Sequence, residues 1–215
     1  MSQEPIPVVD RLCLRSPIPE IAVAAGYLDE AASAHIANKR ELAENLINMA
    51  NMAAIRAWTE SLWGKASPYV QYRTAVGAPP LSRGPQLGRP RMPSPTEQGL
   101  LHIRDGYHCR FCGIPVVRKQ VRVRLKNLYP AALQWGKKNL AQHAAFQAMW
   151  AQYDHVLPYA RGGTNDLDNI IVTCAPCNFG RMDHLLEEVG LAGPRTREPI
   201  RSTWDGLERL LQHPT

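Results

Sequence analysis

The sequence has no long apolar stretch: none of its hydrophobic runs approaches the roughly 18–20 residues that a membrane-spanning helix needs. The first residues also lack a basic segment followed by an apolar one, so no secretory signal is predicted. We therefore expect a cytoplasmic protein with no membrane association. Cysteine is scarce too, with 5 in 215 residues. Because the cytoplasm keeps thiols reduced, metal ligation is favoured over disulfides.

The middle of the chain is short of acidic residues. Residues 65–150 contain 2 Asp and Glu against 14 Lys and Arg. Both flanking segments are acidic, with 8 against 5 in residues 1–64 and 9 against 6 in residues 151–215. Positive charge concentrated in this way is typical of a phosphate-binding surface. A solvated basic face without a partner is the alternative.

The acidic first segment has the periodicity of helices. Apolar residues at helical spacing predict two amphipathic helices, paired as a hairpin, between residue 20 and about residue 63. Asn38, with Glu41 three residues later, is the expected start of the second helix, and Gly64 its stop. The pattern does not decide whether this segment docks on the rest of the chain, dimerises or binds a partner.

Proline, glycine and arginine dominate the next stretch, residues 65–93, which predicts a linker or an extended arm. Ser94, followed by Pro95 and with Glu97 at the third position, predicts the start of a helix that runs to about Arg104.

The second half of the chain is predicted to begin with an insertion, residues 114–150. Residues 121–125 alternate as a half-buried strand does, although a short helix is also possible, and a helix is expected from Pro130 to Trp150 with His143 on its surface. Two strands are then expected at 151–156 and 169–173, joined by a loop. A helix from about Ala175 to Val189 and a tail helix after Ser202, packed back on the body, complete the prediction.

Four of the cysteines form two CxxC pairs, Cys109 with Cys112 and Cys174 with Cys177. Together they supply a tetrahedral thiolate set for zinc, and zinc held by four protein ligands is structural. The 61 residues between the pairs exceed the roughly 15–20 of ordinary four-cysteine sites. Loop closure becomes only slowly more costly with length, so a folded insertion is tolerable. The alternatives are two unrelated pairs or a redox pair, but neither pair lies in a thioredoxin-like βαβ pattern.

The second cysteine pair ends a longer motif. It reads Tyr153-Asp154-His155-Val156-Leu157-Pro158, Gly162-Gly163, Asn165, Asn169-Ile170-Ile171, Cys174 and Cys177-Asn178, and residues 104–112 precede it. Over about residues 95–118 and 150–185 the chain strongly resembles the four-cysteine branch of the HNH endonucleases. That resemblance implies a ββα-metal fold, in which two antiparallel strands, a loop and a helix surround one divalent ion. We expect an α+β protein, mainly helical, around a small ββα-metal HNH core with a four-cysteine zinc knuckle.

The resemblance also implies roles for single residues. His155 matches the general base that activates water, and Asp154 matches the acidic ligand of the catalytic ion. Asn169 matches the middle Asn, which holds the loop and orients the base. Asn178 stands where most members have His, so the chain is an HNN variant whose amide would be the second ligand. A carboxylate with an amide oxygen favours a hard ion, Mg²⁺ or Mn²⁺.

The motif does not by itself fix the orientation of the Asp154 and His155 side chains or a role for the residues after Asn178. Asp154 and His155 are adjacent on a strand, so their side chains point to opposite faces unless the strand is distorted or ends there. Asp183 and His184 follow on the helix and could support the ion, but no motif match assigns them.

The expected organisation is a helical segment 1–64, a linker 65–93, an HNH nuclease domain 94–190 with the basic insertion 114–150, and a tail helix in 191–215. The expected function is metal-dependent hydrolysis of DNA phosphodiester bonds, with double-stranded DNA as partner and a possible protein partner or dimer contact through residues 1–64. The candidate phosphate contacts are Arg118, Lys119, Arg122, Arg124, Lys126 and Arg181. The alternatives are an inactive zinc-stabilised nucleic-acid-binding adaptor and a nuclease effector gated by a partner.

Overall fold

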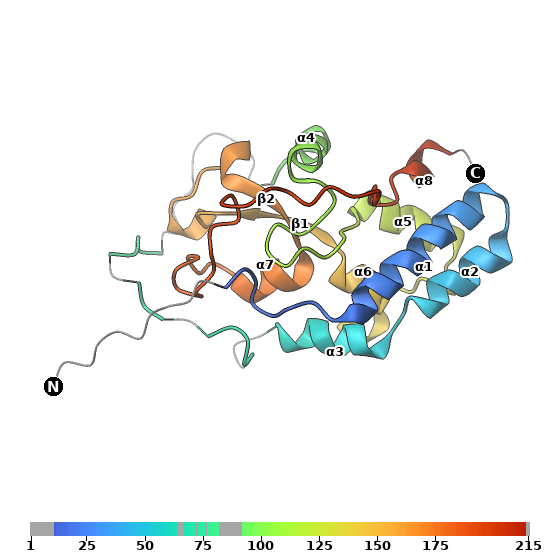
Figure 1. Cartoon of the computed structure of the whole chain (residues 1–215), viewed down its shortest axis with the longest axis horizontal. Helices are drawn as coiled ribbons and strands as arrows, with labels where there is room; N and C mark the ends of the chain where they lie inside the picture. Colours follow the sequence, from blue (N-terminus) through green and yellow to red (C-terminus); the bar gives the residue numbers. More distant parts are fainter. Residues whose placement is uncertain (1–10, 64–66, 72, 76, 82–91, 214–215) are drawn as a thin grey trace.

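A computed structural model describes residues 11–63, 67–71, 73–75, 77–81 and 92–213 (Figure 1). The α-helices are α1 (Pro19–Ile36), α2 (Arg40–Met49), α3 (Ala53–Ser61), α4 (Pro95–Asp105), α5 (Lys119–Leu128), α6 (Ala144–Ala148), α7 (Ala175–Arg181) and α8 (Arg209–Gln212). The strands are β1 (Ala151–His155) and β2 (Ile170–Cys174), and the short 3-10 turns are η1 (Asn139–Ala141), η2 (Tyr159–Arg161) and η3 (Leu167–Asn169). None of the helices within these ranges is both long enough and apolar enough to cross a bilayer.

The first segment folds as three helices, so the predicted pair of helices is wrong in number. Asn38 takes a left-handed conformation, with φ 59°, which Asn tolerates better than most residues. It therefore lies in the turn after α1, and α2 begins two residues later, at Arg40. A second break at Asn51 and Met52 separates α2 from α3, which ends at Ser61. The expected stop at Gly64 lies outside the described residues.

The helix predicted from Ser94 is confirmed. The Ser94 hydroxyl accepts a hydrogen bond from the Glu97 amide at 3.3 Å, and the Glu97 carboxylate accepts one from the Ser94 amide at 2.8 Å. This capping box satisfies two of the amides that a helix start leaves unpaired. At the far end of α4, the Asp105 carboxylate accepts a hydrogen bond from the Val172 amide at 2.9 Å. The helix is thereby fixed to β2.

The insertion differs most from expectation. Residues 119–128 form helix α5, so of the two possibilities left open for residues 121–125 the structure has the helix and not the strand: Val121, Arg122 and Leu125 bury one helical face while Val123 is exposed. The expected long helix from Pro130 to Trp150 is wrong: a loop and η1 lead into the five-residue α6.

His143 is likewise misplaced by the sequence prediction, since it is buried and not on the surface. It precedes α6, and its Nε2 lies 2.8 Å from the carbonyl oxygen of Ile47. Burial lowers the pKa of His143 to about 4. A neutral imidazole therefore joins the insertion to α2.

The two strands pair antiparallel as predicted, with Asp154 opposite Ile171 and His155 opposite Ile170. Helix α7 begins at Ala175 as expected but ends at Arg181, well before Val189. Met182 has φ 55°, which a helix cannot continue through. The predicted tail helix after Ser202 is reduced to α8, although Leu207 and Leu210 of the tail are buried against the body.

One hydrophobic core joins these parts, and it includes residues from α1 to α3, the insertion, the cysteine loop and both strands. Helix α3 packs on α6, and Arg56 donates to the carbonyl oxygens of Asn139 at 2.7 Å and Gln142 at 2.6 Å. The first segment thus packs on the second half of the insertion. The elements β1, β2 and α7 lie toward the opposite end of the molecule from α2 (Figure 1). The division into segments 1–64, 65–93, 94–190 and 191–215 stays a prediction.

Candidate active site and metal centre

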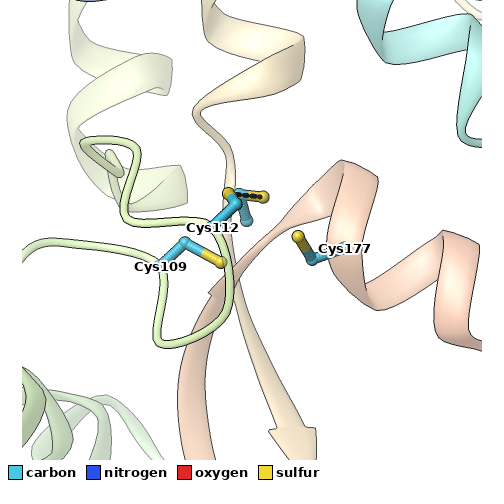
Figure 2. A group of neighbouring side chains, drawn as sticks. Cys109, Cys112 and Cys177 are labelled. Atoms are coloured by element: carbon cyan, nitrogen blue, oxygen red, sulfur yellow. Dashed lines mark hydrogen bonds between the residues drawn. The ribbon is translucent and has the colours of Figure 1, made fainter. Parts of the chain in front are cut away.

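The four predicted zinc ligands come together. Their sulfur atoms all lie within 4.8 Å of one another, and the Sγ atoms of Cys112 and Cys174 are 3.6 Å apart. Four sulfurs at about 2.3 Å from a tetrahedral zinc would be about 3.8 Å apart, so the cluster fits that ion. Figure 2 shows Cys109 and Cys112 on a loop and Cys177 on a facing helix, with their side chains converging. Cys174 is the last residue of β2.

A tight turn shapes the cysteine loop. The Cys109 amide donates to the carbonyl oxygen of Ile114 at 2.9 Å, and the Gly113 amide donates to that of Cys109 at 2.9 Å. Gly113 has φ 80°, a conformation that glycine adopts without strain. The Arg110 amide donates to Val172 at 2.9 Å, so the loop is attached to β2.

None of the five cysteines forms a disulfide. Burial raises the pKa of the Cys174 thiol, because a thiolate loses its hydration in the protein interior. A set of four thiolates in this place therefore needs a cation, and a zinc ion would supply that charge.

A separate cleft of about 490 Å³ contains the other motif residues. Its walls are β1, the turn at 158–160, α7 and the residues just after α7, and Met92 also contributes. His155, Asp154 and Asn178 all line it, as does Asp183. The residues that the sequence assigned to general-base and ion-binding roles thus share one space.

The ring of His155 contacts a loop residue. Its Nε2 atom lies 2.9 Å from Oδ1 of Asn165, and its ring meets that of Tyr159 edge to face with centroids 6.0 Å apart. Because an amide oxygen only accepts, we assign the hydrogen to Nε2, which makes Nδ1 the basic nitrogen. The sequence assigned no role to Asn165, although this residue belongs to the motif given above. Its position two residues after Gly163 was the one signal that it lies in the loop beside the site.

Asn169 holds the loop between the strands. Its amide nitrogen donates to the carbonyl oxygens of Leu157 at 3.0 Å and Thr164 at 2.9 Å, and its Oδ1 accepts from the Leu157 amide at 2.9 Å. Gly163 closes the same turn, where a Cβ would lie 1.8 Å from the carbonyl oxygen of Leu157. These contacts position Asn165, and through it the ring of His155.

Asp154 is buried and paired with a cation. Arg181, which is 0% exposed, donates to its two oxygens at 2.9 and 2.7 Å. Burial raises the pKa of the Asp154 carboxyl, and the Arg181 guanidinium opposes that rise. Because both oxygens accept from Arg181, we assign the ionised form to Asp154. β1 ends at His155, which is how two adjacent side chains can both reach the cleft.

The end of α7 supplies the remaining polar groups. Asn178 lies on α7, and the backbone turn at Met182 brings Asp183 back to the cleft. Carboxylate and amide oxygens are the donors that hard divalent ions prefer, so this set fits Mg²⁺ or Mn²⁺.

Comparison with known families locates the same stretch. Residues 144–190 match the family model described as HNH endonuclease. We call residues 144–190, which match this model, the HNH segment. It spans both strands, the loop and α7, and the cysteine cluster is consistent with the zinc-stapled branch of the family. The mixed fold with its small antiparallel sheet confirms the predicted α+β class. No curated protein and no solved structure matches the chain.

Most of the six candidate phosphate contacts have internal partners. Arg118 pairs with Glu208, and Arg124 donates to the carbonyl oxygen of His213. Arg122 is buried with its guanidinium carbon 3.5 Å from the centre of the Trp135 ring. Of the five candidates on and beside α5, Lys119 and Lys126 are exposed. The sixth, Arg181, is the fully buried partner of Asp154.

Proposed function

We propose that this protein is a metal-dependent endonuclease that hydrolyses phosphodiester bonds in DNA. The observation that carries the proposal is the cleft of the HNH segment, which joins His155 to Asp154 and Asn178. One imidazole for a general base and two oxygen donors for a hard ion are what phosphodiester hydrolysis requires.

In this proposal, Nδ1 of His155 takes the proton from the attacking water. Its other nitrogen is held by Asn165 at 2.9 Å, so the ring keeps one orientation during the transfer. A general base near neutral pH gains the most from such a fixed position, because the water must lie within hydrogen-bond reach. Asn169 contributes by fixing the loop that carries Asn165.

Asp154 and Asn178 would hold the divalent ion. When bound, such an ion offsets the negative charge that develops on the phosphate and on the leaving 3′ oxygen. Asp154 shares its carboxylate with Arg181, so the guanidinium keeps the acid ionised and its oxygens oriented. The four cysteines would hold zinc as a structural ion, with no position left for water.

Nicking of supercoiled plasmid tests the proposal. We expect wild-type protein to nick with Mg²⁺ or Mn²⁺ and not without a divalent ion, and DNA ligase to reseal the nick. Asp154→Asn and Asn178→Ala are expected to raise the ion concentration that gives half-maximal nicking. Asp166→Asn, which changes an exposed acid outside the cleft, is the matched control.

The competing function is a zinc-stabilised adaptor that binds nucleic acid without cutting it. Plasmid that stays supercoiled at every ion concentration, while a labelled oligonucleotide is bound, would establish the adaptor and exclude the nuclease.

A further inference from the structure

An aromatic ring lies at the rim of the cleft that holds His155. Phe179 follows Asn178 directly on α7, lines the same cleft and is 41% exposed. A large apolar side chain exposed beside a candidate active site is more informative than one exposed elsewhere on the surface. Met182 and Met92, each about half exposed, line the cleft as well.

Other rings hold Phe179 in place. Trp63 and Trp150 both meet it edge to face, with centroids 6.0 and 6.1 Å away. Trp150 in turn contacts Trp135 edge to face, and the buried guanidinium of Arg122 lies over Trp135. Within the described ranges, no ring stacks parallel on Phe179. The ring is thus fixed by its neighbours but is not covered by them.

The chemistry of the site limits what covers such a ring. A phosphodiester cut near His155 and Asn178 carries a nucleotide on each side, and Phe179 is the next residue after Asn178. A nucleobase is flat and apolar on its faces, and stacking on an aromatic side chain contributes about 1–3 kcal/mol per base. In an intact duplex both faces of a base are covered by its neighbours, so only an unstacked base can use the ring.

We propose that Phe179 is a stacking platform for an unpaired base next to the scissile phosphate. The preferred substrate would then be DNA with unpaired nucleotides at the cut, such as a gap, a flap or a bubble in a duplex. This inference rests on the proposed nuclease function and adds the class of DNA on which it acts.

Binding without cleavage tests the proposal. The parent protein is the His155→Ala variant, and the ligands are two short duplexes of one sequence, one fully paired and one with a central unpaired stretch that contains 2-aminopurine. In this parent, Phe179→Leu keeps an apolar side chain but removes the ring face, and Phe179→Tyr keeps the ring. Leu140→Ala removes an exposed apolar side chain outside the cleft and is the control.

We expect Phe179→Leu to weaken binding of the unpaired duplex by about 5- to 150-fold, which is the stacking range above converted to affinity. Binding of the paired duplex should stay unchanged. The fluorescence of 2-aminopurine should be quenched by every protein that keeps an aromatic ring at this position, and not by Phe179→Leu. Phe179→Tyr and Leu140→Ala should bind as the parent does.

Unchanged binding of the unpaired duplex by Phe179→Leu overturns the proposal, and so does an equal loss for both duplexes. If Phe179→Leu instead changes the molar mass by light scattering and leaves binding unchanged, a second copy covers the ring. A protein that binds both duplexes but never nicks plasmid contradicts the proposed function alone, because the stacking measurement does not depend on cleavage.

Discussion

Arg181 donates to both carboxylate oxygens of Asp154, at 2.9 and 2.7 Å, and the pair is buried, with Asp154 lining the cleft of the HNH segment. The same guanidinium also donates to the carbonyl oxygens of His155 and His184. One side chain therefore ties the end of β1 to the turn after α7. It has a structural role that a phosphate contact on the surface would not have.

Replacing Arg181 should therefore destabilise the fold. Arg181→Met leaves the Asp154 carboxylate buried without this partner, and breaking a buried ion pair in this way typically lowers the free energy of unfolding by about 3–5 kcal/mol. Urea unfolding of zinc-loaded protein measures the difference. Arg195→Met removes an exposed arginine and should change the free energy of unfolding by less than about 0.5 kcal/mol. A loss below about 1 kcal/mol for Arg181→Met would show that the buried pair contributes little.

Metal analysis should find one zinc per chain in wild-type protein, because four sulfurs lie within 4.8 Å of one another. Cys174→Ser should lose that zinc and unfold at a lower temperature, since binding of a structural zinc contributes directly to folding. Cys13→Ser is the matched control, because Cys13 lies outside the cluster and its variant should keep the zinc. Wild-type protein that stays folded but contains no zinc after mild chelation would contradict the structural zinc site.

Stability should fall as the pH drops from about 6.5 to about 4. Burial lowers the pKa of His143 to about 4, whereas the unfolded chain has an ordinary imidazole with a pKa near 6.5. In that window the unfolded state binds a proton that the folded state does not, so acid favours unfolding. Across the whole window, His143 lowers the free energy of unfolding by about 3 kcal/mol.

His143→Gln tests that linkage, because its amide can still donate to the carbonyl oxygen of Ile47 but has no proton to gain. The variant should lose less stability between about pH 7 and about pH 4 than wild type, as measured by urea unfolding at each pH. Zinc loss in acid affects both proteins alike and cancels in the comparison. If both proteins lose the same free energy of unfolding, groups other than His143 cause the sensitivity to acid.

The turn that positions Asn165 should tolerate no side chain at Gly163. A Cβ there would lie 1.8 Å from the carbonyl oxygen of Leu157 and 2.8 Å from Nδ2 of Asn169. Gly163→Ala should cost about 1–3 kcal/mol and reduce nicking. Gly99→Ala, in α4 with nothing within 4 Å of the new Cβ, should stabilise by about 0.5–1 kcal/mol. Similar thermal unfolding of the two variants would contradict the tight turn.

The sequence predicted the site better than the fold around it. The cysteine pairs, β1, β2 and the start of α7 follow from local patterns, because each depends on residues within a few positions of one another. The capping box at Ser94 is local in the same way. Asn165 and the Arg181–Asp154 pair were missed as contacts because they join residues across the loop and the helix, where spacing alone gives no distance.

The errors in the helices have a common physical cause. Helix and strand patterns compete within short apolar runs, and tertiary burial decides between them. Arg122 is an example: it lies among basic residues in the sequence, yet its guanidinium is buried over Trp135, and that burial selects the helix α5. The backbone turns at Asn38 and Met182, with φ 59° and 55°, end helices where the apolar periodicity continues.

The initial nicking rate of His155→Ala relative to wild type tests the central claim most directly. Both proteins are purified in parallel and assayed on supercoiled plasmid with saturating Mg²⁺ or Mn²⁺, together with His213→Ala, which removes an exposed histidine. Removal of a general base typically costs about 10²- to 10⁴-fold in rate, so His155→Ala should fall by that factor while His213→Ala keeps the wild-type rate. Equal nicking by His155→Ala and wild type would contradict the assignment of His155 as the general base.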